Sequence, residues 1–406
     1  MYIAAAARGI SVCGDILAVT ALALTFQSQG AGGLAVSGLW LAATLPIVVL
    51  APLSGRLVDR VDSRALLVAA GFGQAAVCAA LAFVGHPAAV IALVGVLAAG
   101  LSVTQPTLAA LLPEMVGRDD LPRATAINQT ARGVGAVVAP ALAGLLVGQF
   151  GVRVPLLIDA ASYLAIVAAG LLLRTRRGGR LRVSEVASDG RRTEAAWRLT
   201  ADPLLRATMI SLAAVIGALG AINVVIVFFV REALDASTTV YGVVQASWTA
   251  GMLAGAWLLV AAARRARDDG ALVHGLLVQL GACCAVILAT ALVNAPGWLV
   301  PLWLIGGALN GGINLFQNQL MASRVPPAYR GRGFATLGAA VNGAMLGGFL
   351  AGGVILAYVE PRPIVAGLGI VGLAVVALLV LPVLRTVRRE RAAAADTQPE
   401  TLPMAA

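Results

Sequence analysis

Residues 34–64 read LAVSGLWLAATLPIVVLAPLSGRLVDRVDSR, and this stretch indicates the environment of the chain. Its first part, 34–54, contains no charged residue. It has the length of about 20 apolar residues that a helix needs to cross a bilayer. The second part, 55–64, places three arginines and two aspartates directly after it. The pattern is typical of a transmembrane helix that is followed by a loop at the membrane surface.

The same pattern recurs along all 406 residues. Hydrophobic residues make up 60% of the chain, charged residues only 12%, and the mean hydropathy is +0.91. A soluble domain of this composition would expose large apolar patches to water. We therefore predict an all-α polytopic membrane protein with twelve transmembrane helices. The predicted spans are 8–28, 34–54, 65–85, 88–112, 123–149, 153–173, 204–230, 238–263, 271–293, 297–321, 332–358 and 362–384.

The arginines predict the orientation of these spans. All 29 basic residues are arginine, and 24 of them lie in the links after even-numbered spans or in the C-terminal tail. Only three lie in the links after odd-numbered spans. The positive-inside rule then places both termini in the cytoplasm, in a multi-pass protein of the inner (cytoplasmic) membrane. Because the charge lies in loops between apolar spans and not along a soluble groove, no nucleic-acid partner is expected.

The longest link divides the chain into two groups of six spans. We predict an N-terminal half at 1–174, a cytoplasmic central loop at 175–203, a C-terminal half at 204–385 and a disordered tail at 386–406.

The two halves also repeat weakly. A shift of 209 residues places Gln105 on Asn314 and Ala143-Gly144 on Gly352-Gly353, and a shift of 208 places Asp15 on Asn223. Two pseudo-symmetric halves with polar groups at related depths are how many transporters form a central site.

Several function classes find no support in the sequence. The four cysteines lie inside apolar runs without metal-ligand spacing, and His86 and His274 flank spans singly. The phosphate-binding pattern GxxxxGK[ST] is absent, so ATP cannot drive the protein within this chain. No cluster of catalytic residues occurs in the spans. We therefore predict no metal, no cofactor and no enzymatic activity.

The link at 55–64 resembles the signature loop of the major facilitator superfamily. That loop has a glycine, three residues, an Asp-Arg pair and further basic residues, here Gly55, Asp59, Arg60 and Arg64. The number of spans, the topology, the central loop and the half repeat agree with the family as well. Asp62 departs from the pattern, because the family usually has glycine there.

The resemblance implies a cytoplasmic gate. Asp59 would face the positive N-terminus of the eleventh helix, and Arg60 or Arg64 would pair with Glu114 at the end of span four. Each contact near water contributes about 1 kcal/mol, which suits a gate that breaks in every cycle. A topology anchor is the alternative, and it explains the arginines but not Asp59.

Span five carries a second motif, at 133–144, GVGAVVAPALAG. It resembles the glycine-proline motif of proton-coupled exporters in the same superfamily, with Gly135, Pro140 and Gly144 as its landmarks. Small residues allow close packing against the other half, and Pro140 frees a backbone carbonyl. The resemblance implies antiport. Small-residue packing without a directional meaning is the alternative.

Three ionisable residues are predicted to be buried in the membrane: Asp15, Arg132 and Asp159. At 1.5 Å per residue, Asp15 and Arg132 both lie roughly 10–14 Å inside the cytoplasmic boundary. Charges at such depth are usually paired or functional. We predict an ion pair between Asp15 and Arg132, with Asp15 as the proton-coupling group. A static structural pair is the alternative, and Asp159 is a weaker candidate that could simply hydrogen-bond a neighbouring helix.

Polar side chains in span ten predict a substrate cavity. Asn310, Asn314, Gln317 and Asn318 lie on or near one helical face. The predicted cavity residues are Gln105, Asn223, Gln245, Trp248, Asn310 and Asn314, with Trp40 as further apolar surface. Polar contacts that merely join helices are the alternative.

The loops at 111–124 and 325–332 are similar to those of the bacterial branch of drug and siderophore exporters. The resemblance implies proton-coupled efflux of small amphipathic molecules, such as drugs or natural products, by alternating access. It also implies a monomer whose partners are the substrate, protons and membrane lipid. The alternative is an uptake symporter or facilitator for a neutral small solute.

Overall fold

The computed structural model describes residues 2–115, 120–172, 202–265, 268–326 and 329–396. These residues form helices and no strand. The helices of the first half are α1 (Tyr2–Ser28), α2 (Gly32–Arg60), α3 (Ser63–Leu81), α4 (Pro87–Met115), α5 (Leu121–Phe150) and α6 (Arg153–Leu172).

The second half contains more elements because two of its membrane crossings are interrupted. Its elements are α7 (Pro203–Gly220), α8 (Ile222–Phe228), the π-helix η2 (Phe229–Ala233), α9 (Thr238–Leu258), α10 (Val260–Arg265), α11 (Asp269–Leu292), the 3₁₀-helix η3 (Pro296–Trp298), α12 (Leu299–Arg324), α13 (Arg330–Ile355) and α14 (Pro361–Asp396). One crossing consists of α7, α8 and η2, and another of α9 and α10.

The predicted all-α polytopic fold is confirmed. Within the described residues, eleven segments are long and apolar enough to cross a membrane. The 20-residue α6 occupies the remaining predicted position. One boundary was wrong, because α14 is helical to Asp396 and so includes residues predicted to be disordered. Arginine and alanine, which make up most of residues 386–396, are good helix formers. The central loop lies almost wholly outside the described residues, in 173–201.

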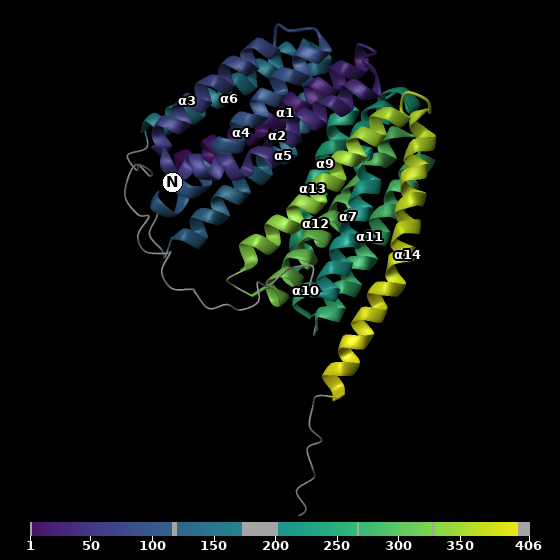
Figure 1. Ribbon diagram of the computed structural model, residues 1–406. Coiled ribbons are helices and arrows are strands. Elements are labelled where there is room, and N and C mark those ends of the chain that lie inside the picture. The colour runs from purple at the N-terminus through teal and green to yellow at the C-terminus, as the bar shows by residue number, and fades with distance from the viewer. Residues whose placement is uncertain (1, 116–119, 173–201, 266–267, 327–328, 397–406) are drawn as a thin grey trace, which may run out of the picture.

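Two helical bundles, α1–α6 and α7–α14, meet at one end of the molecule and separate toward the other (Figure 1). The end at which they meet holds the α1–α2, α5–α6 and α13–α14 turns, and we call it the closed end. The opposite end holds Arg60, Arg265 and Arg324 at the ends of α2, α10 and α12, and we call it the arginine-rich end.

The backbones of α5 and α9 come into direct contact at the closed end. A Cβ atom on Gly144 would overlap the carbonyl group of Thr238, and one on Gly242 would overlap the carbonyl of Pro140. The Thr238 hydroxyl donates a hydrogen bond to the Gly144 carbonyl at 2.8 Å. The contact continues along both helices to Gly133, opposite Leu253. Only glycine allows this approach, which is typical of helix packing in lipid.

The helices α2 and α13 repeat this contact on the other side of the molecule. A Cβ atom on Gly353 would lie 2.8 Å from the Gly33 carbonyl oxygen. The Ser37 hydroxyl donates to the Phe349 carbonyl at 2.8 Å. The 209-residue shift that relates Gly144 to Gly353 also relates Gly33 to Gly242. The closed end therefore contains two related glycine contacts, one between α5 and α9 and one between α2 and α13.

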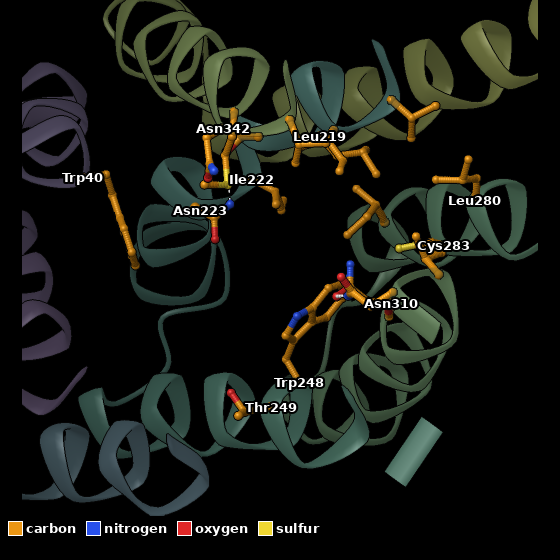
Figure 2. A pocket seen from close by; sticks show the side chains of 18 of the residues that line it. Trp40, Leu219, Ile222, Asn223, Trp248, Thr249, Leu280, Cys283, Asn310 and Asn342 are labelled. Carbon is orange, nitrogen blue, oxygen red and sulfur yellow. Dashed lines mark hydrogen bonds between the residues drawn. The ribbon is translucent and has the colours of Figure 1, made fainter. Parts of the chain in front are cut away.

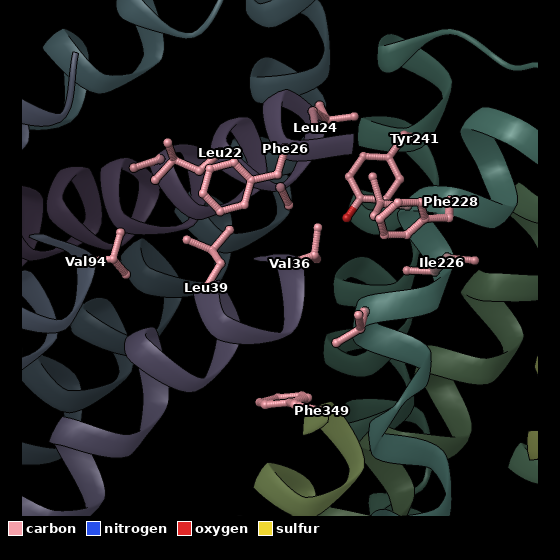
Figure 3. Packing of buried hydrophobic residues seen from close by; sticks show 14 of the residues in the cluster. Leu22, Leu24, Phe26, Val36, Leu39, Val94, Ile226, Phe228, Tyr241 and Phe349 are labelled. Atoms are coloured by element: carbon pink, nitrogen blue, oxygen red, sulfur yellow. The ribbon is translucent and has the colours of Figure 1, made fainter. Parts of the chain in front are cut away.

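Polar and apolar side chains complete the closed end. Gln27 Nε2 donates to Glu232 Oε1 at 3.0 Å, and Arg231 Nε donates to Gln27 Oε1 at 3.4 Å. Beneath these groups, residues of both halves form one buried cluster, in which Phe26 and Phe228 lie on opposite sides of the interface (Figure 3). The interface therefore excludes water at this end.

Glycines also set the spacing of α9 and α12 inside the second half. A Cβ atom on Gly307 would overlap the backbone carbonyl of Trp248, and one on Gly306 would lie 2.7 Å from Trp248 Cζ3. These two glycines therefore fix where the indole of Trp248 lies.

Gly307→Ala should lower the midpoint of thermal unfolding in detergent, because α9 and α12 would have to separate. Overpacking of a tight site typically costs about 1–3 kcal/mol. Gly73→Ala is the matched control, since no atom lies within 4 Å of the position of the added Cβ. Equal midpoints for the two variants would contradict the packing described for α9 and α12.

Candidate functional site

A cavity of about 590 Å³ lies between the two halves. Among the described residues of the first half, Ile16, Thr20, Trp40 and Pro140 line it. The second half supplies most of the wall, and the open space is surrounded by amide, indole and aliphatic side chains (Figure 2). The volume falls within the range of about 300–1,000 Å³ that is usual for small-molecule sites.

Five of the six predicted cavity residues lie on this wall. They are Asn223, Gln245, Trp248, Asn310 and Asn314. Gln317 joins them, as expected for one face of α12, whereas Asn318 is exposed outside the cavity lining. The sixth residue, Gln105, lies elsewhere, inside the first half.

Several wall residues were missed by the sequence analysis. Asn342 is the clearest case, because it is the only amide side chain of α13 and it faces the cavity. A lone amide in a span of small and apolar residues was the signal that could have identified it. Trp303 and Thr20 gave no such signal, since their positions depend on how the helices pack.

The polarity of the cavity comes from neutral groups. Among the described residues that line it there is no Asp, Glu, Arg or His. Its amide and hydroxyl side chains are Thr20, Asn223, Gln245, Thr249, Asn310, Asn314, Gln317 and Asn342, and the indole N–H groups of Trp40, Trp248 and Trp303 add further donors.

A second polar site lies wholly within the first half. Arg8, Asp15, Gln105 and Arg132 line a pocket of about 20 Å³ between α1, α4 and α5. A pocket needs a volume of roughly 10–15 Å³ to hold one water molecule, so the pocket beside Asp15 can be hydrated.

The structure does not form the predicted ion pair between Asp15 and Arg132. Asp15 accepts a short hydrogen bond from the Tyr163 hydroxyl of α6 instead. Arg132 Nε is buried without a hydrogen-bond partner, although both side chains line the small pocket. The phenol of Tyr163 reaches α1 from α6 and so holds the carboxyl. A single tyrosine in an apolar span gave no sign of this role.

Asp159 lies close to Asp15 and is fully buried. Its carboxylate accepts hydrogen bonds from Cys78 Sγ of α3 at 2.9 Å and from Ser162 Oγ at 3.0 Å. The contact with α3 is a hydrogen bond between neighbouring helices, as the alternative interpretation of Asp159 expected. The absence of a side chain at Gly14 makes room for the carboxylate beside α1.

The predicted gating loop is described only in part. Gly55 lies in the last turns of α2, where an added Cβ would meet open space. Asp62 caps α3, and Arg64 Nη2 donates to the Leu171 carbonyl at 3.0 Å. The side chains of Asp59 and Glu114 lie outside the described part of the chain, so their contacts with Arg60 and Arg64 stay predictions.

The second half contains two ion pairs at the arginine-rich end. Arg324 of α12 pairs with Asp269 of α11 at 2.8 Å and with Asp202, the cap of α7, at 3.2 Å. These pairs join three helices of the second half without reaching the first half.

The glycine-proline motif of α5 faces two directions. A Cβ on Gly135 would lie 2.6 Å from the Gly9 carbonyl oxygen of α1, inside the first half. Pro140 and Gly144 contact α9 of the second half, as described above. The motif therefore lies between the small pocket and the interface of the halves.

Solved structures of transporters share this architecture. The chain superposes on the nucleoside transporter NupG with a TM-score of 0.70 at 16% identity, covering 94% of this chain and 98% of that one. A peptide transporter, POT, gives a TM-score of 0.74 at 14% identity, with 95% of each chain covered. A bacterial homologue of the iron transporter ferroportin, in its inward-facing state, gives 0.70 at 16% identity, covering 94% and 96%. At such low identity, these similarities show the fold alone.

Sequence comparison gives the family. A stretch of 161 residues is 29% identical to the uncharacterized MFS-type transporter YfiS of Bacillus subtilis (strain 168). The match spans 39% of this chain and 38% of that protein's length. The family model of the Major Facilitator Superfamily matches residues 4–320. The chain therefore belongs to the major facilitator superfamily and is a membrane transporter, not an enzyme.

Proposed function

We propose that this transporter exports small amphipathic molecules, such as drugs or natural products, in exchange for protons. The observation that carries the proposal is a neutral cavity between two halves that contact each other at the closed end. The positive-inside rule makes the arginine-rich end cytoplasmic, so this conformation would open to the cytoplasm. The proposed location is the inner membrane, where a monomer with two cytoplasmic termini works by alternating access.

The walls of the cavity suit an amphipathic substrate. Trp248 and Ile222 offer apolar area, and the amides of Asn223 and Asn310 lie beside them (Figure 2). Binding sites of this kind use apolar contacts for affinity and a few polar groups for orientation.

Asp15 is the proposed proton-binding group. Among the described residues, neither Asp15 nor Asp159 forms an ion pair with a basic side chain. Two unpaired negative charges inside a membrane are very unfavourable, so we infer that one carboxyl group holds a proton. Asp15 lines a pocket that can hold water, whereas Asp159 is fully buried. Asp15 is therefore the group that can exchange its proton with the solvent.

The position of α1 supports coupling between this proton and the substrate. Asp15 faces the small pocket, and its neighbour Ile16 and Thr20 line the central cavity. A shift of α1 on protonation would therefore move part of the cavity wall. The proposed direction of transport, export and not import, rests on the resemblance of the Gly135–Gly144 segment to the exporter motif.

Asp15→Asn should abolish gradient-driven dye uptake into inverted membrane vesicles, because the amide cannot exchange a proton. The wild type should accumulate the dye under an inward-acid gradient and lose this uptake with an uncoupler.

Asp159→Asn is the matched comparison, since it removes the carboxylate of Asp159 and retains that of Asp15 beside the small pocket. Loss of uptake in Asp159→Asn and not in Asp15→Asn would move the coupling role to Asp159. Dye accumulation in right-side-out vesicles instead of inverted ones would favour the uptake symporter.

Gly144→Leu should hold the closed end apart, because the added side chain would occupy the space of the Thr238 carbonyl. A reporter cysteine at Thr249 on the cavity wall, in a variant whose native cysteines are replaced by alanine, should then react faster with an impermeant maleimide added outside the cell. Gly73→Leu, which projects into open space, is the control. Unchanged labelling in Gly144→Leu would show that this contact does not close the external side.

A further inference from the structure

We propose that the central cavity selects uncharged, ring-containing molecules that carry at least two N–H or O–H donors. This inference rests on the proposed substrate cavity and names the chemical class that it takes.

The absence of charge on the wall disfavours ions. No carboxylate, guanidinium or imidazole occurs among the described residues that line the cavity. An ion that enters would lose hydration without gaining an opposite charge, and such burial is costly. A neutral molecule of the same size avoids this loss.

Three asparagines present acceptor atoms to the cavity. The amide nitrogen of Asn223 donates to the Gly220 carbonyl at 3.2 Å, that of Asn314 to the Asn310 carbonyl at 2.9 Å, and that of Asn342 to the Gly338 carbonyl at 2.9 Å. In each case the partner is a backbone carbonyl within one turn of the chain, which can only accept. The amide nitrogen must therefore face the helix backbone.

This orientation leaves the Oδ1 atoms of the three asparagines available. They come from three different elements of the cavity wall, α8, α12 and α13. The oxygen of Asn223 points into that space in Figure 2. Because an unmet acceptor in an apolar environment is unfavourable, a ligand that supplies N–H or O–H groups is preferred over one that does not.

Two indole rings supply apolar area for a ring. Trp40 lies on one side of the open space and Trp248 on another (Figure 2). Each is held by a second aromatic ring, because Trp40 packs against Phe349 at 5.8 Å between centroids and Trp248 against Trp303 at 5.2 Å. Aromatic faces bind rings and also cations. The wall carries no negative charge that would favour the cation.

Four indole probes of similar size separate these properties. They are 5-hydroxytryptophol, which is neutral, the cation 5-hydroxytryptamine, the anion 5-hydroxyindole-3-acetate, and a neutral tryptophol whose N–H and O–H groups are all methylated. Binding of each to the purified full-length protein is measured by calorimetry in detergent. We expect 5-hydroxytryptophol to bind at least about tenfold tighter than the other three, since each hydrogen bond to the wall contributes about 0.5–1.5 kcal/mol.

Equal or tighter binding of either ion would overturn the exclusion of charge. Equal binding of the methylated probe would overturn the role of the acceptors, and no binding of 5-hydroxytryptophol by monodisperse, cooperatively melting protein would overturn the proposal as a whole.

Variants of α12 test whether the acceptors act in the cavity. Asn314→Leu should weaken binding of 5-hydroxytryptophol about three- to tenfold and leave that of the methylated probe unchanged. Asn318→Leu is the matched control, because Asn318 is exposed on the same helix outside the cavity lining. Equal losses in both variants, or for both probes, would contradict the assignment.

The binding measurements need no proton gradient, so their outcome is independent of coupling and direction. Selective binding without transport would retain the ligand class and reject proton-coupled export. Gradient-driven export of a charged dye, with no preference for the neutral probe in binding, would retain proton-coupled export and reject the ligand class.

Discussion

The backbone contact between α5 and α9 determines how the rest of the molecule is arranged. In a bilayer, helices gain little from burying apolar side chains against each other, so association depends on close approach of their backbones. Gly144 and Gly242 permit that approach, and the Thr238 hydroxyl adds a hydrogen bond across it. The related contact of α2 with α13 holds the opposite side of the interface. With both contacts at the closed end, the halves can separate toward the arginine-rich end and leave a cavity between them (Figure 1).

The internal repeat places comparable groups in two different environments. Asn223 and Asn314 lie on the wall of the central cavity, whereas Asp15 and Gln105, their counterparts in the repeat, line the small pocket of the first half. One half thus supplies most of the neutral cavity wall, and the other holds the buried carboxyl groups Asp15 and Asp159. The helix α1 lines both spaces, with Asp15 at the small pocket and Ile16 and Thr20 at the cavity, and the proposed coupling rests on this arrangement.

The sequence predicted what depends on hydropathy and helical periodicity. Span lengths were sufficient for the all-α polytopic fold, and the spacing of Asn310, Asn314 and Gln317 placed them on one face. The partner of Asp15 could not be predicted in this way. Depth along the helix axis favoured Arg132, but the rotation of α1 turns the carboxyl toward Tyr163 of α6. Such rotations are set by which small residues meet between helices, and no periodicity in one helix encodes them.

The central claim is that the protonation state of Asp15 controls how far the halves separate. The most direct test is the distance between spin labels at Arg56→Cys in α2 and Arg332→Cys in α13, in a variant without native cysteines. It would be measured by double electron–electron resonance in liposomes at mildly acidic and mildly basic pH. The account predicts that pH shifts the distance distribution, and that Asp15→Asn shows the acidic distribution at both pH values. An Asp15→Asn variant that still responds to pH like its parent would contradict it.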